Sequence, residues 1–345
     1  MITKHIFAIS TYIKQHNKSK ILRSSARSPL ILLATCLMLG ILFMAGCQIG
    51  AGDHEGGEVH LLVTANFGQE TVFDERVDVQ PGENINSVME RHMEVEYAYG
   101  GGFINAIEGI RSGYTGEGER GEKKDWFLYV NGILSEAAAG SHLPEEGDVV
   151  WWDYHSWDDV FFVPAVVGSF PQPFVNGYRG DHPGAQILHG KGAEEPSEKL
   201  GAYLEEEGLS EELKISPYEQ SAAEDRSRMT LVVALWEELA DSDYWQGLQD
   251  NRSRTGWFVE FEEEEITPLH MDGTRPETGE EAAGAVLATG SGMGDKNPLW
   301  LVTARDSESL QRLVEKVVSS PQKLSGKAGA VLIEDELWEI PWLAE

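Results

Sequence analysis

The sequence has 345 residues, 41% of them hydrophobic, which is enough length for two domains and enough apolar content to bury a core in each. Its 58 acidic residues outnumber the 27 basic ones, and the formal net charge is −31. A surface of that sign repels phosphate backbones, so nucleic acid is not an expected partner. The composition predicts a folded, strongly acidic protein and excludes a disordered chain.

The beginning of the chain has the opposite charge. Residues 1–52 contain six basic side chains and no acidic one, and Pro29–Ala45 is apolar almost throughout. The segment Met44–Cys47 then resembles the signal of the bacterial lipoprotein family, in which small residues precede a cysteine that accepts diacylglycerol. The resemblance implies a cleaved signal peptide over residues 1–46 and an extracytoplasmic body held at the bacterial cell membrane by lipid on Cys47. An uncleaved membrane-spanning anchor is the alternative, because the apolar segment is near the minimum spanning length.

Cysteine usage agrees with export. Cys36 lies in the apolar part of the leader and would be removed with it, whereas Cys47 would carry lipid. The mature chain would then have no disulfide and no thiol for catalysis or metal binding, which excludes cysteine hydrolases and Cys-ligated zinc. Residues 47–57, rich in glycine and acid, are expected to form a tether.

The first folded region is predicted from alternation and capping. Asn84 is placed to cap a short helix in which Ile85, Val88 and Met89 fall on one face. Strands are expected at Val59–Ala65, Thr71–Val79, Val95–Tyr99 and Phe103–Ile107. With the two aromatic segments that follow, the order strand–strand–helix–strand–strand–strand indicates a β-grasp, a mixed sheet wrapped around a single helix.

Two aromatic segments, Asp125–Gly132 and Gly147–Tyr154, are the most distinctive feature of this region. Because successive side chains of a strand point to opposite faces, Trp126 shares one face of its strand with Leu128, and Tyr129 lies on the other. Both faces of the sheet therefore carry large rings, but one helix covers only one face. The uncovered face must bind a ligand, dock against the rest of the chain or contact a partner. For any single ring, ordinary core packing is the plain alternative.

Three motifs in this region carry a resemblance: Gly102–Gly109, Trp126–Gly132 and Glu146–Trp151. Together they are similar to the transcobalamin C-terminal-like family, a bacterial surface module related to the smaller domain of the cobalamin carriers. The similarity covers residues 58–158 and implies a β-grasp fold that binds cobalamin or another corrinoid, for delivery to a vitamin importer. In the carriers a larger helical barrel completes the site, and the sequence contains no helical repeats of that kind.

The candidate ligand-binding residues combine aromatic side chains with one histidine. His155 is the candidate axial ligand, since an imidazole nitrogen can ligate cobalt. Asp153, Asp158 and Asp159 with His155 could instead bind a divalent ion, although a solvated turn is the favoured interpretation. No metal site is therefore assigned, and cobalamin is considered only as a ligand. The full predicted set is Tyr99, Phe103, Trp126, Tyr129, Trp152, Tyr154 and His155.

Residues 160–345 are expected to form a second, α/β domain of unknown role. It begins with an apolar connector that contains several prolines, and this connector is expected to be packed and not to act as a flexible linker. Gly290–Gly294 follows a predicted strand, but no helix opens after it, so a flexible loop is expected and not a phosphate site. Helices are predicted at Glu195–Glu207 and Ser307–Val318, and strands at Leu231–Leu239 (ambiguous with helix), Trp257–Phe261, Ala285–Thr289, Leu299–Thr303, Ala330–Ile333 and Leu337–Ile340.

The fold class predicted from these elements is α+β: a β-grasp domain followed by an α/β domain. The sequence contains no Gly-x-Ser-x-Gly elbow, Walker loop or His-Glu-x-x-His motif, and no catalytic residue is assigned. We therefore expect a lipoprotein that binds a ligand without catalysis. The rival hypothesis is a structural or interaction module of the cell envelope, and an enzyme housed in residues 160–345 is the third.

Overall fold

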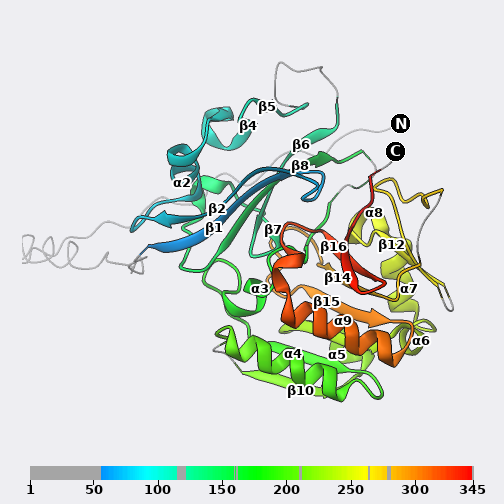
Figure 1. Ribbon diagram of the computed structural model, residues 1–345. Helices are drawn as coiled ribbons and strands as arrows, with labels where there is room; N and C mark the ends of the chain where they lie inside the picture. The colour runs from blue at the N-terminus through cyan, green and yellow to red at the C-terminus, as the bar shows by residue number, and fades with distance from the viewer. Residues whose placement is uncertain are drawn as a thin grey trace, which may run out of the picture. The chain divides into compact units, whose positions relative to one another are not determined.

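The structure is a computed structural model that describes residues 56–114, 122–158, 160, 162–209, 212–262, 265–277 and 281–343 (Figure 1). The expected signal peptide, Cys47 and most of the expected tether lie outside the described residues. Residues Asp53–Glu345 form one compact unit. Within the described ranges, no helix has both the length and the apolar character needed to cross a membrane. The fold belongs to the α+β class, as the sequence predicts.

The first region is a mixed five-stranded sheet. Its strands are β1 (Gly57–Ala65), β2 (Glu70–Val79), β6 (Lys124–Val130), β7 (Ile133–Leu134) and β8 (Val149–Ser156), in the spatial order β2-β1-β8-β6-β7. The central strands β1 and β8 run parallel, and the other neighbours are antiparallel. Helix α2 (Ile85–His92) follows the first hairpin. A helix after the first hairpin and a central parallel pair are the features of a β-grasp.

Helix α2 begins where the sequence predicts. The Asn84 side chain accepts a hydrogen bond from the backbone N–H of Ser87 at 3.1 Å, which satisfies one of the free donors at the helix start. Such a cap contributes about 1 kcal/mol to stability. Ile85, Val88 and Met89 are buried and belong to the core that covers one face of the sheet.

A small antiparallel sheet lies between α2 and β6 in the chain. It consists of β3 (Val95–Ala98), the 3-10 turn η1 (Tyr99–Gly101), β4 (Phe103–Ile107) and β5 (Ile110–Arg111). Ile104 and Ile107 are buried in the same core as α2. The helix and this small sheet together cover one face of the β-grasp sheet (Figure 1).

The second region is built on a seven-stranded sheet with the order β10-β9-β11-β15-β14-β16-β17. Strands β9, β10, β11 and β15 are parallel, whereas β14, β16 and β17 join them through antiparallel pairs. The bounds are β9 (Ala185–His189), β10 (Leu213–Pro217), β11 (Met229–Leu235), β14 (Gly284–Thr289), β15 (Leu299–Ala304), β16 (Gly329–Ile333) and β17 (Glu336–Ile340). A separate pair joins β12 (Val259–Phe261) to β13 (Ile266–Pro268).

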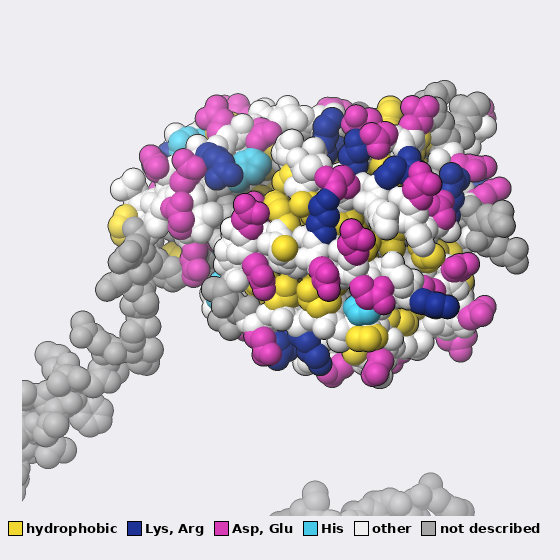
Figure 2. Space-filling view, turned by 60° about the horizontal axis from the view of Figure 1, so that its bottom comes forward, with side chains coloured by type: hydrophobic (Ala, Val, Ile, Leu, Met, Phe, Trp, Pro, Cys, Tyr) yellow, Lys and Arg dark blue, Asp and Glu magenta, His cyan; other side chains and the backbone are white. Residues whose placement is uncertain are grey.

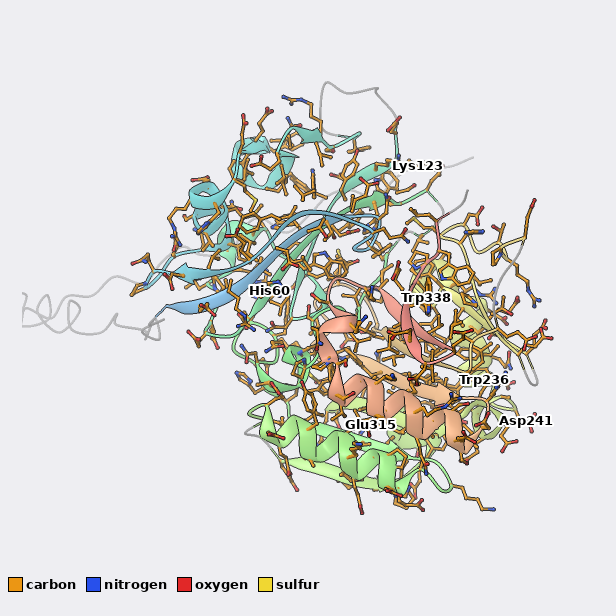
Figure 3. All side chains as sticks on the ribbon, in the orientation of Figure 1. His60, Lys123, Trp236, Asp241, Glu315 and Trp338 are labelled. Carbon is orange, nitrogen blue, oxygen red and sulfur yellow. The ribbon has the colours of Figure 1, made fainter. Side chains whose placement is uncertain are left out.

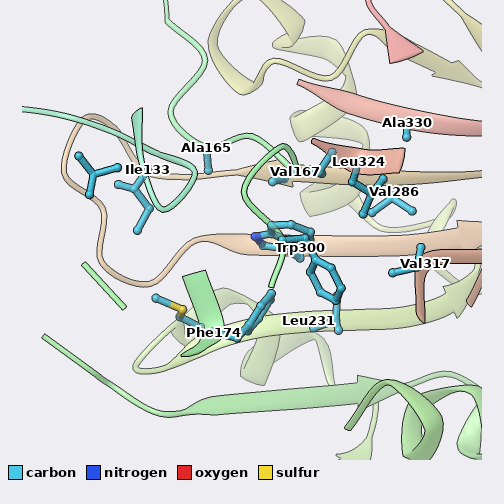
Figure 4. Close-up of a cluster of buried hydrophobic side chains, with 14 of the residues drawn as sticks. Ile133, Ala165, Val167, Phe174, Leu231, Val286, Trp300, Val317, Leu324 and Ala330 are labelled. Carbon is cyan, nitrogen blue, oxygen red and sulfur yellow. The ribbon is translucent and has the colours of Figure 1, made fainter. Parts of the chain in front are cut away.

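Helices α4 and α9 cover one face of this sheet (Figure 1). In the core beneath them, the Trp300 ring lies 5.2 Å from Phe174 and 5.7 Å from Phe170, and Figure 4 shows Trp300 among the aliphatic side chains of neighbouring strands. Besides α2, the helices of the described chain are α3 (Gln172–Val175), α4 (Glu194–Glu206), α5 (Gln220–Asp225), α6 (Trp236–Leu239), α7 (Asp243–Asp250), α8 (Arg252–Thr255) and α9 (Ser307–Ser319), with the 3-10 turns η2 (Ala139–Ser141) and η3 (Pro321–Leu324).

The predicted elements of the second region are largely confirmed. Helices α4 and α9 and the C-terminal hairpin agree with the expectation to within about one residue. The segment Leu231–Leu239, ambiguous between strand and helix, contains one after the other, because strand β11 ends at Leu235 and helix α6 begins at Trp236. Strands β9 and β10 were not predicted. Four of the five residues of β9 are buried, so it lacks the polar alternation that reveals a half-exposed strand.

Candidate functional site

The face of the β-grasp sheet that α2 leaves open is covered by the rest of the chain. Trp151 and Tyr129 are fully buried there, and their ring centroids lie 5.2 Å apart. Gly168, in the connector after β8, lies so close to Trp151 that a side chain on Gly168 would not fit. The Phe67 ring lies 5.7 Å from Phe258 of the second region. Of the three alternatives for this face, docking against the rest of the chain is what the structure contains.

The connector itself is packed, as expected. Val163, Ala165, Val166 and Val167 are each 1% exposed or less. The backbone N–H of Val166 donates to the carbonyl of Gly132, which ties the connector to the turn of the β6–β7 hairpin. Phe161 lies outside the described residues.

His155 lies in a closed slot on the same face. Its ring is stacked between Phe67 at 4.1 Å and Phe127 at 4.2 Å, and its Nδ1 lies 2.7 Å from Oδ2 of Asp153. Asp153 is fully buried and also accepts hydrogen bonds from Thr64 Oγ1 at 2.5 Å and from the backbone N–H of Phe67. The histidine is only 2% exposed, so its ring is enclosed by these neighbours.

The favoured interpretation of the Asp153–Asp159 segment as a solvated turn is wrong for its first half. Asp153 and His155 lie within β8 and are buried, because the strand continues to Ser156. Asp158 is exposed and forms an ion pair with Lys123, and Asp159 lies outside the described residues. Within the described part of the chain, no group of three His, Cys, Asp or Glu side chains is arranged to hold a metal ion.

Trp126 and Tyr154 connect the main sheet to the small sheet. Their rings lie 5.2 Å apart. The indole Nε1 of Trp126 donates to the carbonyl of Ile110 at 3.1 Å, and the Tyr154 hydroxyl donates to the carbonyl of Arg111 at 3.0 Å. Both acceptors belong to β5, so these two side chains anchor the β4–β5 hairpin to the main sheet. Trp152, at 6% exposed, is part of the core beneath α2.

Tyr99 and Phe103 are the two predicted residues that face solvent. They are 78% and 61% exposed, and their rings meet edge to face at 5.8 Å. The turn that carries them is tight, since Tyr99 has φ +50° and Gly100 has φ +72°. The left-handed conformation of Tyr99 is uncommon for a residue with a side chain, and such conformations are concentrated at functional sites.

A second pair of rings, one exposed and one half-buried, follows the small sheet. Tyr114 is 69% exposed and meets the half-buried Trp157 edge to face at 5.9 Å. The backbone N–H of Ser112 donates to the carbonyl of Asn105, and that of Gly113 donates to the carbonyl of Lys124, so the chain leaves the small sheet and joins the start of β6 directly before Tyr114. We call Tyr99, Phe103, Tyr114 and Trp157 the exposed aromatic cluster.

Sequence reasoning missed Tyr114 and Trp157 for identifiable reasons. Tyr114 lies in a glycine-rich polar segment whose structure periodicity does not predict, and Trp157 follows the last residue of β8. The sequence signal that could have identified them is a large aromatic residue in a segment that lacks the hydrophobic periodicity of a buried strand or helix. Lys123 lies beside the cluster, with its Nζ 5.9 Å from the Trp157 ring centroid, at a cation–π distance.

The glycine-rich segment Gly290–Gly294 is a loop between two antiparallel strands. Asp295 orders it, because its carboxylate accepts from the backbone N–H of Ser291 at 2.6 Å and pairs with Arg226 at 3.0 Å. Strand β15 begins at Leu299, so no helix N-terminus faces the glycines. The expected absence of a phosphate-binding loop is consistent with this arrangement.

Comparison with known proteins gives partial matches. A family model described as a domain of unknown function (DUF4430) matches residues 82–156. A crystal structure of haptocorrin in complex with Cbi is 21% identical, with a TM-score of 0.25, and the match covers 31% of this chain and 27% of that one. A crystal structure from Ruminococcus gnavus ATCC 29149, described as that of a candidate metal-binding protein, is 12% identical, with a TM-score of 0.23, over 29% of this chain and 97% of that one. No curated protein matches the chain.

The family model lies within the β-grasp region, and both structural matches have TM-scores of 0.25 or less. The chain spans about a quarter of the length of haptocorrin, and the matched part is less than a third of this chain. The assignment of a ligand therefore depends on the chemistry of the site.

Proposed function

We propose that the chain is a cell-surface binding protein that captures a corrinoid, such as cobalamin, on the exposed aromatic cluster without catalysing a reaction. Lipid on Cys47 would hold it at the outer side of the cell membrane, where it would pass its ligand to a vitamin importer. The observation that carries the proposal is the exposure of Tyr99, Phe103 and Tyr114, between 61% and 78%, in two ring pairs, one before and one after the anchored β4–β5 hairpin.

Exposed rings in a group favour a binding role. Leaving apolar area in water costs about 25 cal/mol per Å², so a group of exposed rings is maintained against a free-energy penalty. Stacked aromatic rings contribute about 0.5–1.5 kcal/mol per pair beyond the area that they bury. A corrin macrocycle is broad and conjugated, and it can contact more than one ring of the cluster at once. Among flat ligands, the resemblance of residues 58–158 to the transcobalamin C-terminal-like family favours the corrinoid.

Binding is tested by titrating the full-length chain with hydroxocobalamin while tryptophan fluorescence and the corrin absorption bands are followed. A saturable change is expected, and replacing both Tyr99 and Phe103 by alanine should weaken it about tenfold or more, which corresponds to about 1.4 kcal/mol. Trp338→Ala is the matched control, because Trp338 is also 49% exposed but lies well away from Lys123 beside the cluster (Figure 3). Absence of saturation at micromolar ligand would reject the corrinoid and favour the interaction module.

The axial role of His155 has its own readout. In the structure the ring would have to leave its slot between Phe67 and Phe127 to reach cobalt. A change in the visible spectrum of the bound corrinoid in His155→Ala would support axial ligation. An unchanged spectrum would leave His155 as a structural residue and leave the aromatic cluster as the site.

The membrane attachment is tested separately. Cys47→Ala should release the protein from the membrane fraction or leave it unprocessed at its signal peptide. Continued retention of a processed-size Cys47→Ala chain would contradict lipid attachment at Cys47. If the unaltered chain itself has its unprocessed size in the membrane fraction, the uncleaved anchor is favoured.

A further inference from the structure

Strand β17 forms a free edge of the seven-stranded sheet. Only β16 pairs with it, through a two-residue turn that fixes the register. After that turn, the backbone N–H and C=O groups of alternate residues point toward β16, namely those of Glu336, Trp338 and Ile340. The backbone groups of Leu337 and Glu339 point away from β16. Throughout the described ranges, no backbone hydrogen bond joins Leu337 or Glu339 to a segment outside the hairpin. The outward-facing donors and acceptors of the strand are therefore not paired with another strand of the described chain.

A groove of about 960 Å³ borders this strand. Its apolar wall consists of Trp338, Trp342 and Leu343, of which Trp338 and Leu343 are each 49% exposed. Residues 274–277, in the loop after β13, supply further lining residues. Gln69 Nε2 donates to the carbonyl of Pro341 at 2.8 Å and fixes the chain where β17 ends. The groove thus has one strand edge, an apolar wall and a polar rim.

Two other outer strands carry features that discourage pairing. β10 contains Lys214 and ends at Pro217, and Lys and Pro are typical of edges that do not accept another strand. β2 has charged side chains at five of its ten positions. β17 differs because it exposes a large indole. Its two glutamates are paired with lysines, Glu336 with Lys323 at 3.5 Å and Glu339 with Lys327 at 3.0 Å.

Charge indicates the kind of partner. Arg275 borders the groove, but its guanidinium is paired with Glu260 and Glu262, each at 2.6 Å. Glu277 is exposed, and no ion pair with it is found among the described residues. The whole chain carries −31, and Figure 2 shows acidic side chains spread over one face between apolar patches. A basic segment is therefore complementary to the rim.

We propose that the β17 edge and its groove bind an extended, basic segment of a partner protein as an additional strand. Only a polypeptide supplies the repeating N–H and C=O groups that match Leu337 and Glu339. Alternate apolar side chains of that segment would pack on Trp338 and Trp342, and a Lys or Arg between them would reach Glu277. This site shares no residue with the exposed aromatic cluster, so it does not depend on corrinoid binding.

The test uses the full-length chain and an end-blocked peptide that alternates lysine and valine. Titration at physiological ionic strength should give a saturable change in tryptophan fluorescence that is lost in Trp338→Ala. Hydrogen exchange at the Leu337 and Glu339 amides should slow when the peptide is bound. The same peptide N-methylated at alternate amides keeps its charge but cannot form the ladder, and it should bind about tenfold more weakly or worse.

A matched pair of variants separates the backbone from the side chain. Glu339→Pro removes the outward N–H and should weaken binding about tenfold, whereas Glu339→Ala removes the same charge but keeps the N–H and should bind normally. No saturable binding of the unmodified peptide, or equal binding of the N-methylated one, would overturn the proposal. The peptide comparison is made on the unaltered chain, so it decides the question even where the proline variant fails to fold.

Discussion

Two groups of aromatic side chains in the β-grasp region are chemically similar, but one group is buried and the other is exposed to solvent. Tyr129 and Trp151 are fully buried, covered by the connector at Gly168. Tyr99 and Phe103 are more than half exposed at the end of a hairpin. The difference is what covers each group, and it separates rings that stabilise the molecule from rings available to a ligand.

The largest effect is expected from Trp151→Ala. The indole is fully buried, and its Nε1 donates to Thr64 Oγ1 at 2.8 Å, so removal leaves a cavity and an unused acceptor. We expect the free energy of unfolding in urea to fall by about 3–5 kcal/mol. Tyr99→Ala, at 78% exposed, should change it by less than about 0.5 kcal/mol. Similar losses in the two variants would contradict the assignment of Trp151 to the core and of Tyr99 to the surface.

The sequence alone predicts which face each of these rings belongs to. Strand alternation separates Trp126 from Tyr129 and Trp152 from Trp151, and the two hydrophobic cores divide them in that way, with Trp126 and Trp152 in the core that contains α2. The cap at Asn84 and the order of the strands were predictable for the same reason, since local periodicity and capping determine them.

The sequence does not indicate which segments of the chain cover each face of the β-grasp sheet. The connector that follows its own strand covers Trp151. Phe67 is covered by Phe258, which lies 191 positions further along the chain. Hydrophobic pattern does not specify such long-range contacts. The anchoring of β5 by Trp126 and Tyr154 was also hidden, because it depends on where the indole N–H and phenol O–H point.

The second prediction concerns the polar part of the buried face. Asp153 accepts hydrogen bonds from Thr64 and Phe67 and lies 2.7 Å from His155, so Asp153→Ala leaves several buried groups without a partner. The free energy of unfolding should fall by about 3 kcal/mol, because each unmet buried group costs about 1–3 kcal/mol. Asp153→Asn keeps one acceptor oxygen and should lose less, as measured by urea unfolding. Equal losses in the two variants would mean that the charged carboxylate, which both variants lack, accounts for the effect, and that the acceptor oxygen and volume kept by asparagine contribute little.

The third prediction extends the comparison to a titratable group. His142 is 3% exposed, and burial, with the nearby Arg179 guanidinium, lowers its pKa to about 4. In the unfolded chain a histidine titrates near 6.5, so as pH falls the unfolded state takes up the proton first. The stabilising contribution of neutral His142 is therefore present above pH 6.5 and is lost as pH falls toward about 4, by at most about 3 kcal/mol.

The measurement is the free energy of unfolding against pH in the unaltered chain and in His142→Gln. Carboxylates titrate in both proteins, so the difference between the two curves isolates the histidine. The difference should narrow steadily from pH 6.5 to about 4. Parallel curves would show that the imidazole is not held neutral by its surroundings, against the buried position that it has beside Ser135.

The smallest effect is expected from Tyr154→Phe, and it tests the link between the buried and exposed groups. The substitution keeps the ring and removes only the hydroxyl that donates to the carbonyl of Arg111. A hydrogen bond of this kind contributes about 1 kcal/mol. Because Tyr154 is half-buried, the effect should be local: amide exchange at Ile107 and Ser112 should rise about fivefold while global stability changes little.

Tyr99→Phe is the control for this change, because it removes the same atom from a tyrosine that is 78% exposed. If the hairpin holds the exposed aromatic cluster in place, Tyr154→Phe should also weaken corrinoid binding, although its hydroxyl is directed at β5. Faster exchange with unchanged binding would mean that the cluster keeps its arrangement without this anchor. Unchanged exchange would instead mean that Trp126, through its own bond to Ile110, is sufficient to hold β5 against the sheet.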